Sequence, residues 1–369
     1  MRGIIILTVV FFISISCSNI ENGYIIKGVI DGSEEVLNGG KIYILKHSQS
    51  KIYLDSAIMK SGKFVFKGNV DTPDKYLLYV NGLSYNIPLF LENSRYIIKA
   101  KSDNLREAVV SGGETQSLIN ISNSKSRDVM KKYNLNAVLN ELMGENVSEE
   151  RREHNRAVLE RANIEMKRFT DSLIHKNLCA YFTLLNLSEI VNTLPLKDVE
   201  KRFEMVRDCE KFRNSERIRE ISSIIERRRE LEPGKIAPGF SIANNGYLEP
   251  LYELVNNKKL IVLFFWASWS TESVEAGKIL KEIYEKYASK GVEIIAVSVN
   301  DIDSKQEEVI KNERFSWIHT NNSTNTSLMQ DYCITTIPHI FLLNNRGEIL
   351  SNNLKTNEIY RCIEEILKN

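Results

Sequence analysis

Two serines stand three positions apart, Ser270 and Ser273, where an apolar run gives way to a helical segment. A serine hydroxyl has no accessible anion at neutral pH unless a strong base takes its proton, and it cannot form a disulfide. Ser270 or Thr271 can instead cap the helix by accepting a backbone N–H bond, and Glu272 suits the positive end of the helix dipole. This spacing favours a helix cap over a nucleophile.

A histidine near the same turn raises the alternative of a serine hydrolase. His339 follows Pro338 and could approach Ser270 or Ser273 as a base. No Gly-x-Ser-x-Gly elbow surrounds either serine and no acid that would orient the histidine is identifiable, so we do not favour this chemistry. We also expect no metal and no cofactor, because no phosphate-binding loop or dinucleotide motif occurs and the other histidines lack metal-ligand spacing. These are His47, His154, His175 and His319.

Three cysteines outside the amino-terminal segment could carry sulfur chemistry. Cys179 and Cys209 lie in sequence of helical character and could pair with each other, but spacing alone cannot establish a disulfide. Cys333 lies five residues before Pro338 and is interpreted as an idle or buried thiol, with a relocated nucleophile as the alternative.

Charge excludes one class of partner. The 369 residues carry a formal net charge of +1, and the most basic run, Glu226 to Glu230, is flanked by acids. Nucleic-acid binding draws on a clustered basic surface that releases counterions. We therefore expect no nucleic-acid partner, and we interpret the run as a solvated helix face.

The elements that position the two serines alternate between strand and helix from Pro233 onward. Lys259 to Trp266 is a continuous apolar run of the kind that forms a strand buried on both faces. The elements expected after it are a helix over 274–287, a strand over 292–299, a helix over 304–313, a strand pair over 339–343 and 348–350, and a closing helix over 355–367.

Two regions that precede Pro233 differ in amino-acid composition and in the spacing of their apolar residues. From Tyr24 to about Gly113, short runs rich in β-branched and aromatic residues are separated by Gly-bearing turns, which is typical of an antiparallel sandwich or barrel. From about Glu114 to Leu231, glycine nearly disappears and charges interleave with apolar residues at helical spacing. We expect several helices there.

The carboxy-terminal region resembles the thioredoxin-like lipoproteins and membrane-tethered thiol-disulfide oxidoreductases of the bacterial cell envelope that are related to TlpA and ResA. The amino-terminal strands resemble the small β domain of unknown function that precedes such domains, on the stretches Leu54 to Ala57 and Ser61 to Gly68. The carboxy-terminal resemblance rests on four stretches, Ala237 to Phe240, Leu263 to Trp269, Lys290 to Ser298 and Tyr332 to Leu343.

This resemblance implies that Ser270 and Ser273 occupy the positions of the two redox cysteines of the family, so that thiol-disulfide exchange is closed at this turn. Phe264 stands where many members carry a buried acidic proton acceptor. Family members bind an extended polypeptide beside a cis proline, here Pro338. The implied binding groove consists of Trp269, Thr271, Glu272, Ile337 and Pro338.

The first residues are not part of the fold. Arg2 precedes an apolar run from Ile4 to Ile15, and the small residue Ser16 precedes Cys17. This is the pattern of a secretory signal peptide, and it resembles a bacterial lipoprotein cleavage box with Cys17 as the lipid attachment point. The alternative is an ordinary signal peptide with an incidental cysteine.

Together these patterns predict a multidomain α/β protein with a signal peptide (1–16), an antiparallel β-sandwich-like domain (17–113), a helical middle region (114–231) and a thioredoxin fold (232–369). We expect an exported, lipid-anchored accessory protein of a Gram-negative envelope, on the periplasmic side or the cell surface. Its partners would be the membrane, through the anchor, and a protein or peptide at the groove. It would have no catalytic residue. The alternative is a thiol-disulfide oxidoreductase that acts through Cys333, Cys179 or Cys209.

Overall fold

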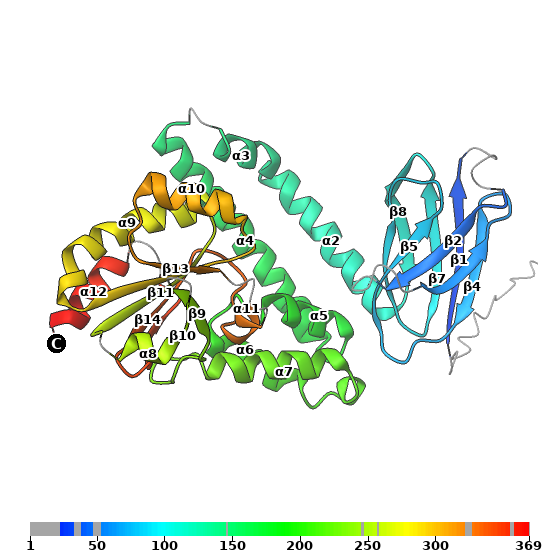
Figure 1. Cartoon of the computed structure of the whole chain (residues 1–369). Helices are drawn as coiled ribbons and strands as arrows, with labels where there is room; N and C mark the ends of the chain where they lie inside the picture. The colour runs from blue at the N-terminus through cyan, green and yellow to red at the C-terminus, as the bar shows by residue number, and fades with distance from the viewer. Residues whose placement is uncertain are drawn as a thin grey trace, which may run out of the picture. The chain divides into compact units, whose positions relative to one another are not determined.

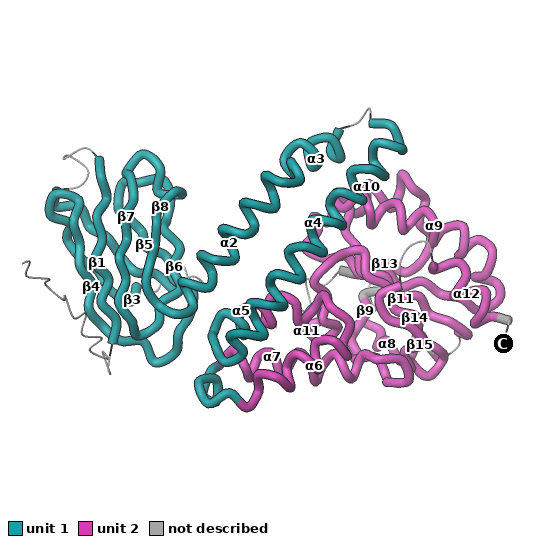
Figure 2. Tube along the Cα trace, turned by 180° about the vertical axis from the view of Figure 1, so that it is seen from behind, with its two compact units in different colours: residues 1–184, 209–215 teal, residues 185–208, 216–369 magenta. Residues whose placement is uncertain are grey.

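The computed structural model describes residues 23–32, 38–46, 53–144, 147–244, 247–256, 258–321, 327–354 and 358–368. The predicted signal peptide and the predicted lipid attachment point, Cys17, lie outside these ranges. The chain forms two compact units, residues 1–184 with 209–215 and residues 185–208 with 216–369 (Figure 2). Among the described residues, no helix combines the length and the apolar content needed to cross a bilayer.

The amino-terminal domain is a β-sandwich of two four-stranded sheets (Figure 1). One sheet has the order β4-β1-β7-β8 and the other the order β3-β2-β5-β6. Inward side chains of both sheets share one apolar core. Every neighbouring pair is antiparallel except β1 and β7, which run parallel. The strands are β1 (Tyr24–Asp31), β2 (Lys41–Lys46), β3 (Tyr53–Ile58), β4 (Lys63–Gly68), β5 (Asp74–Val80), β6 (Ile87–Leu91), β7 (Arg95–Lys101) and β8 (Asn104–Gly112).

Helices dominate the middle of the chain, as the sequence predicts. Glu165 of α4 accepts hydrogen bonds from Lys125 and Lys132 of α2 at 2.6 Å each, which holds these two helices together. The division between the two compact units falls within this helical stretch. The helices are α2 (Glu114–Lys132), α3 (Leu135–Leu142), α4 (Glu149–Lys176), α5 (Tyr181–Ile190), α6 (Leu196–Val206), the 3₁₀ helix η1 (Glu210–Phe212) and α7 (Glu216–Arg229).

The carboxy-terminal domain is built on a five-stranded sheet of order β13-β12-β11-β14-β15 (Figure 1). The inner strands β11 and β12 are parallel, and β14 runs antiparallel to β11. The elements are β9 (Ser241–Asn244), β10 (Tyr247–Pro250), α8 (Leu251–Val255), β11 (Leu260–Trp266), α9 (Thr271–Tyr287), η2 (Ala288–Lys290), β12 (Val292–Ser298), α10 (Asp303–Glu313), β13 (Ile318–Asn321), α11 (Leu328–Asp331), β14 (His339–Asn344), β15 (Ile349–Asn352) and α12 (Ile359–Lys368).

Strand β11 is buried on both faces, which explains its unbroken apolar sequence. Leu260, Val262, Phe264 and Trp266 share a core with residues of α9 and α12. The residues between them, Ile261, Leu263 and Phe265, belong to a second core that includes part of α11. The expected fold class is confirmed, with a thioredoxin fold in the carboxy-terminal region, a β-rich amino-terminal domain and a helical middle region.

Candidate functional site

The two serines lie at the start of helix α9, directly after the central strand β11. Ser270 is the N-cap residue of α9, and its hydroxyl accepts a hydrogen bond from the backbone N–H of Ser273 at 3.2 Å. The same hydroxyl donates to Oε2 of Glu272 at 3.5 Å. Only 6% of Ser270 is exposed. The hydroxyl is thus engaged in capping the helix, as the sequence predicts.

Ser273 is fully buried, and its hydroxyl has no hydrogen-bond partner among the described residues. A buried polar group without a partner costs free energy, because it loses its hydrogen bonds to water on folding and forms no new one. Phe264 of β11 is also fully buried and stacks on Trp266 with ring centroids 6.0 Å apart. The interior around the start of α9 therefore offers an aromatic surface at Phe264 and no carboxylate at that position.

The turn before α9 is tied to the loop after β12. Asp301 accepts hydrogen bonds from the backbone N–H of Ser268 and from its hydroxyl, the latter at 2.6 Å. Nε1 of Trp269 donates to the carbonyl oxygen of Asn300 at 3.2 Å, while 63% of the side chain stays exposed. Neither Asp301 nor Asn300 was foreseen from the sequence. These contacts hold the exposed indole of Trp269 beside Ser270, the N-cap residue of α9.

The cis proline lies at the same end of the sheet as this turn. The Ile337–Pro338 peptide bond is cis, as the sequence predicts for this position. The last pair between β11 and β14 is Phe265 with His339, so the segment that follows β11 and the segment that precedes β14 leave the sheet at the same end of these two strands. Ile337 and Pro338 are half-buried there. This end of the sheet thus carries the two segments that hold the predicted groove residues, Trp269, Thr271, Glu272, Ile337 and Pro338.

His339 is occupied elsewhere. Its Nε2 hydrogen-bonds Oδ1 of Asn352 at 3.0 Å, and its ring stacks on Phe341. Burial lowers the pKa of His339, and the bond to Asn352 opposes this in part. Among the described residues, no hydrogen bond joins His339 to Ser270 or Ser273, which leaves the hydrolase alternative without a base.

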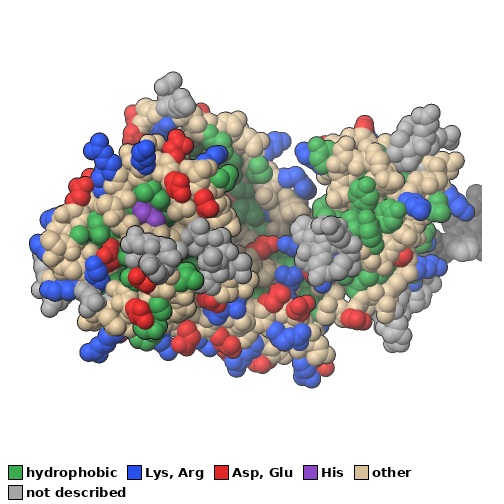
Figure 3. Space-filling view, in the orientation of Figure 1, with side chains coloured by type: hydrophobic (Ala, Val, Ile, Leu, Met, Phe, Trp, Pro, Cys, Tyr) green, Lys and Arg blue, Asp and Glu red, His purple; other side chains and the backbone are tan. Residues whose placement is uncertain are grey.

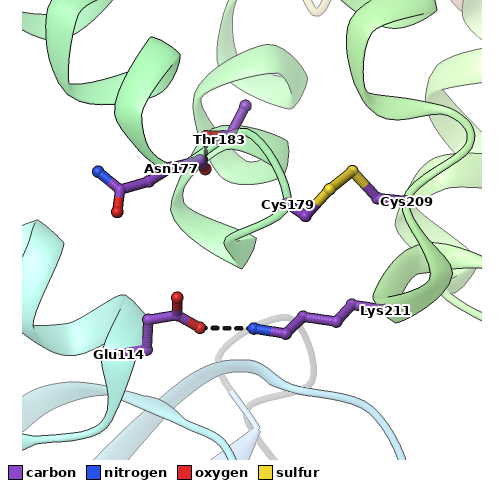
Figure 4. The surroundings of a disulfide bond; sticks show 6 residues. All are labelled: Glu114, Asn177, Cys179, Thr183, Cys209 and Lys211. Atoms are coloured by element: carbon purple, nitrogen blue, oxygen red, sulfur yellow. Dashed lines mark hydrogen bonds and ion pairs between the residues drawn. A yellow bond between two sulfur atoms is a disulfide. The ribbon is translucent and has the colours of Figure 1, made fainter.

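Cys179 and Cys209 form a disulfide with their Cα atoms 5.5 Å apart (Figure 4). The prediction that both lie in helical sequence was wrong in detail. Cys179 lies in the turn between α4 and α5, and Cys209 directly precedes η1. Next to this bond, Nζ of Lys211 pairs with Oε2 of Glu114 at 2.7 Å. Both sulfurs are therefore committed to a cross-link.

Two cysteines of the described chain are free thiols. Cys333 is half-buried, and this burial raises its pKa, although Arg227 and Arg228 act in the opposite direction. A raised pKa lowers the thiolate fraction and with it the reactivity. Cys362 of α12, which the prediction passed over, is also free and packs at the edge of the core formed with α9.

A central β-strand that leads through a capped turn into a helix, facing a cis proline at the start of an antiparallel strand, defines a thioredoxin-fold domain. Residues 257–349 match the family described as thioredoxin-like, and residues 24–119 match the family described as a domain of unknown function, DUF4369. The carboxy-terminal region is therefore thioredoxin-like, and the amino-terminal domain matches the DUF4369 model.

Two curated relatives are similar to the carboxy-terminal region. Thiol-disulfide oxidoreductase ResA of Bacillus thuringiensis subsp. konkukian is 28% identical over 140 residues, which is 37% of this chain and 78% of that protein. Sporulation thiol-disulfide oxidoreductase A of Bacillus subtilis is 30% identical over 97 residues, which is 26% of this chain and 58% of that protein. Among solved structures, a thiol-disulfide oxidoreductase from Bacteroides fragilis is 28% identical, with 36% of this chain and 99% of that chain covered and a TM-score of 0.33.

Proposed function

We propose that this chain is an exported, lipid-anchored thioredoxin-fold protein that lacks the redox cysteine pair and acts as a non-catalytic binding or accessory protein of the cell envelope. The observation that carries this proposal is the turn at the start of α9. Ser270 and Ser273 stand where thiol-disulfide oxidoreductases of this fold need two cysteines, and the Ser270 hydroxyl serves as the helix cap.

The surroundings of the two serines support the loss of redox chemistry. An attacking cysteine works as a thiolate, which a nearby proton acceptor and a positive environment favour. Here the strand position behind the turn is the buried Phe264, and Glu272 places a carboxylate beside the cap. Such a site is not arranged to lower the pKa of a thiol.

The residues at the end of β11 and the start of β14 support a binding role. Trp269 is exposed, and the cis Pro338 precedes β14 at the same end of the sheet. A large exposed aromatic side chain supplies contact area at a low cost in conformational entropy, which suits recognition of a partner. The partner we propose is a protein or an extended peptide that pairs with backbone beside Pro338.

A crosslinking experiment tests the binding role. A photoreactive residue placed at Trp269 is expected to trap a discrete partner in intact cells, and the same residue placed at the exposed Tyr252 of α8 serves as the control. If the two positions crosslink the same set of proteins, the proposed binding site beside Pro338 is contradicted.

Export and anchoring rest on the segment before the fold. Cys17 follows an apolar run and a small residue, the pattern of a cleaved lipoprotein. Mass spectrometry of the mature amino terminus tests this directly, with an acylated Cys17 as the expected result. A mature chain that begins elsewhere, without lipid, would reduce the proposal to an ordinary exported protein.

The second candidate function is a thiol-disulfide oxidoreductase that uses other cysteines. The disulfide between Cys179 and Cys209 is the observation in its favour, since a reducible pair exists in the chain. If this function holds, reduction of a substrate disulfide by the wild-type protein disappears in the Cys179→Ser/Cys209→Ser variant or after alkylation of Cys333. Under the first proposal there is no such activity to lose.

A further inference from the structure

The outer face of the sheet β4-β1-β7-β8 collects lysines that are far apart in the sequence. Along β1, β4 and β7, inward residues are buried and every second residue points outward. The outward positions include exposed lysines from all three strands. We call this surface the basic face, and its lysines are Lys27, Lys63, Lys67, Lys99 and Lys101.

Aliphatic side chains alternate with these lysines across the strands. The register sets Val65 of β4 beside Lys27 of β1, and Lys27 beside Ile97 of β7. In the next row, Lys99 lies opposite Val109 of β8. Val65, Ile97 and Val109 are 48%, 57% and 61% exposed, respectively. The basic face is thus a mixture of cations and exposed aliphatic groups.

Negative charge on these four strands is sparse. Their acidic residues are Asp31 at the end of β1 and Glu107 in β8. In the described part of the chain, none of the five lysines takes part in an ion pair. By contrast, basic and acidic side chains are interspersed over the thioredoxin-like domain on the side drawn in Figure 3. The five lysines outnumber the carboxylates of Asp31 and Glu107, although Asp31 lies opposite Lys101 in the register, so the basic face carries a net positive charge.

This composition fits one kind of partner. A second copy of the chain would bring like charges together, which disfavours self-association through this face. A bilayer that contains anionic phospholipids offers phosphates to the lysines and an acyl boundary to the aliphatic groups, which is the combination that interfacial surfaces use.

The position of the face along the chain agrees with a membrane. Strand β1 begins at Tyr24, seven residues after Cys17. A fully extended segment of that length spans at most about 25 Å. If Cys17 carries lipid, as the proposed function holds, the tether delivers the first strand of this very sheet to the bilayer surface.

We infer that the basic face of the amino-terminal domain docks on the phosphate headgroups of an anionic phospholipid bilayer. Lysines bind the phosphates, and Val65, Ile97 and Val109 contact the boundary between headgroups and acyl chains. Only the tether geometry rests on the proposed anchor, because the face itself is complete without lipid. Docking would hold this sheet of the β domain against the membrane surface.

Vesicle flotation tests this inference with the chain from Ser18 onward, which carries no lipid. The expected result is co-flotation with vesicles of equal phosphatidylglycerol and phosphatidylcholine in 0.1 M NaCl, and release in 1 M NaCl, where the Debye length falls to about 3 Å. Vesicles of phosphatidylcholine alone should retain at least tenfold less protein. Because no lipid is attached, failure here would leave the proposed anchor at Cys17 untouched.

Charge reversal locates the contact. Lys27→Glu/Lys99→Glu is expected to weaken binding to the anionic vesicles at least tenfold, since each lysine near such a surface contributes about a fivefold effect. The matched control, Lys41→Glu/Lys131→Glu, changes the same net charge on exposed positions of β2 and α2. Equal losses in both variants, equal binding to both vesicle types, or binding to heparin but not to vesicles would each overturn the inference.

Discussion

Two places in this chain show opposite uses of the positions where sulfur chemistry could occur. Between α4 and η1, Cys179 and Cys209 form a covalent cross-link within one compact unit. At the start of α9, in the thioredoxin-like domain, a hydroxyl at Ser270 caps the helix. The difference agrees with the proposed function, in which sulfur stabilises the structure and the thioredoxin-like domain binds a partner.

Removing the cross-link is the largest change we expect. A disulfide that closes a loop of 30 residues restricts the unfolded chain by about 3–4 kcal/mol in the entropy model. Cys179→Ser/Cys209→Ser should lower the free energy of unfolding of the unit that holds them by about this amount. Hydrogen exchange of residues 114–180 measures it, with Cys362→Ser as the control. Unchanged protection would indicate that the bond has no structural role.

The second prediction concerns acid sensitivity of the thioredoxin-like domain. Burial lowers the pKa of His319 to about 4, from the ordinary value near 6.5, in a cluster with Trp266 and Trp317. Between these two pH values the unfolded chain binds the extra proton and the native chain does not. The free energy of unfolding should therefore fall as pH drops from about 6.5 to 4, by roughly 2–3 kcal/mol.

Tryptophan fluorescence follows this domain alone, because all three tryptophans of the chain lie in it. His319→Phe should flatten most of the acid-side loss, with the difference from wild type at pH 7.5 giving the packing effect of the substitution. Parallel pH curves for the two proteins would contradict a titration at His319 and would point to another group.

The third prediction separates the cap from its neighbour. Ser270→Ala removes the hydroxyl that accepts the N–H of Ser273, and should destabilise the domain by about 1 kcal/mol. Thr271→Ala is the matched control, because Thr271 is exposed and is not the N-cap residue. Equal effects in urea titrations would mean that Ser270 is no cap.

The smallest effect is expected at Ser273, and it has the opposite sign. Its hydroxyl is buried without a partner, so Ser273→Ala should leave stability unchanged or raise it by up to about 1 kcal/mol. Thermal unfolding of this variant beside Ser270→Ala gives the comparison. A clear loss of stability at Ser273 would reveal a hydrogen bond that the hydroxyl makes in solution.

Local patterns in the sequence predicted most of the fold. The apolar run of β11 required burial on both faces, and Gly-bearing turns between β-rich runs indicated the sandwich. The sequence could not establish the disulfide, because pairing of two cysteines depends on the distance between their Cα atoms, which tertiary packing alone sets. The parallel pairing of β1 with β7 was beyond the sequence for the same reason.

The helix cap and the cis proline were predictable from the sequence, but the residues that support the turn were not. Ser270 and Pro338 stand out in the sequence, whereas Asp301, which fixes the backbone of Ser268, comes from another strand's loop. The basic face was also hidden, because Lys27, Lys63 and Lys99 are dozens of residues apart and become neighbours only through strand pairing. A sequence that seemed to lack a basic surface acquires one when it folds.

The most direct measurement of the central claim is the rate at which the reduced protein cleaves the disulfides of insulin in the presence of a thiol reductant. The wild-type chain is expected to show the rate of the protein-free reaction, and Ser270→Cys/Ser273→Cys is expected to exceed it, because two thiols then occupy the start of α9. A wild-type rate well above the protein-free reaction, abolished when its thiols are alkylated, would contradict the claim that exchange has been lost.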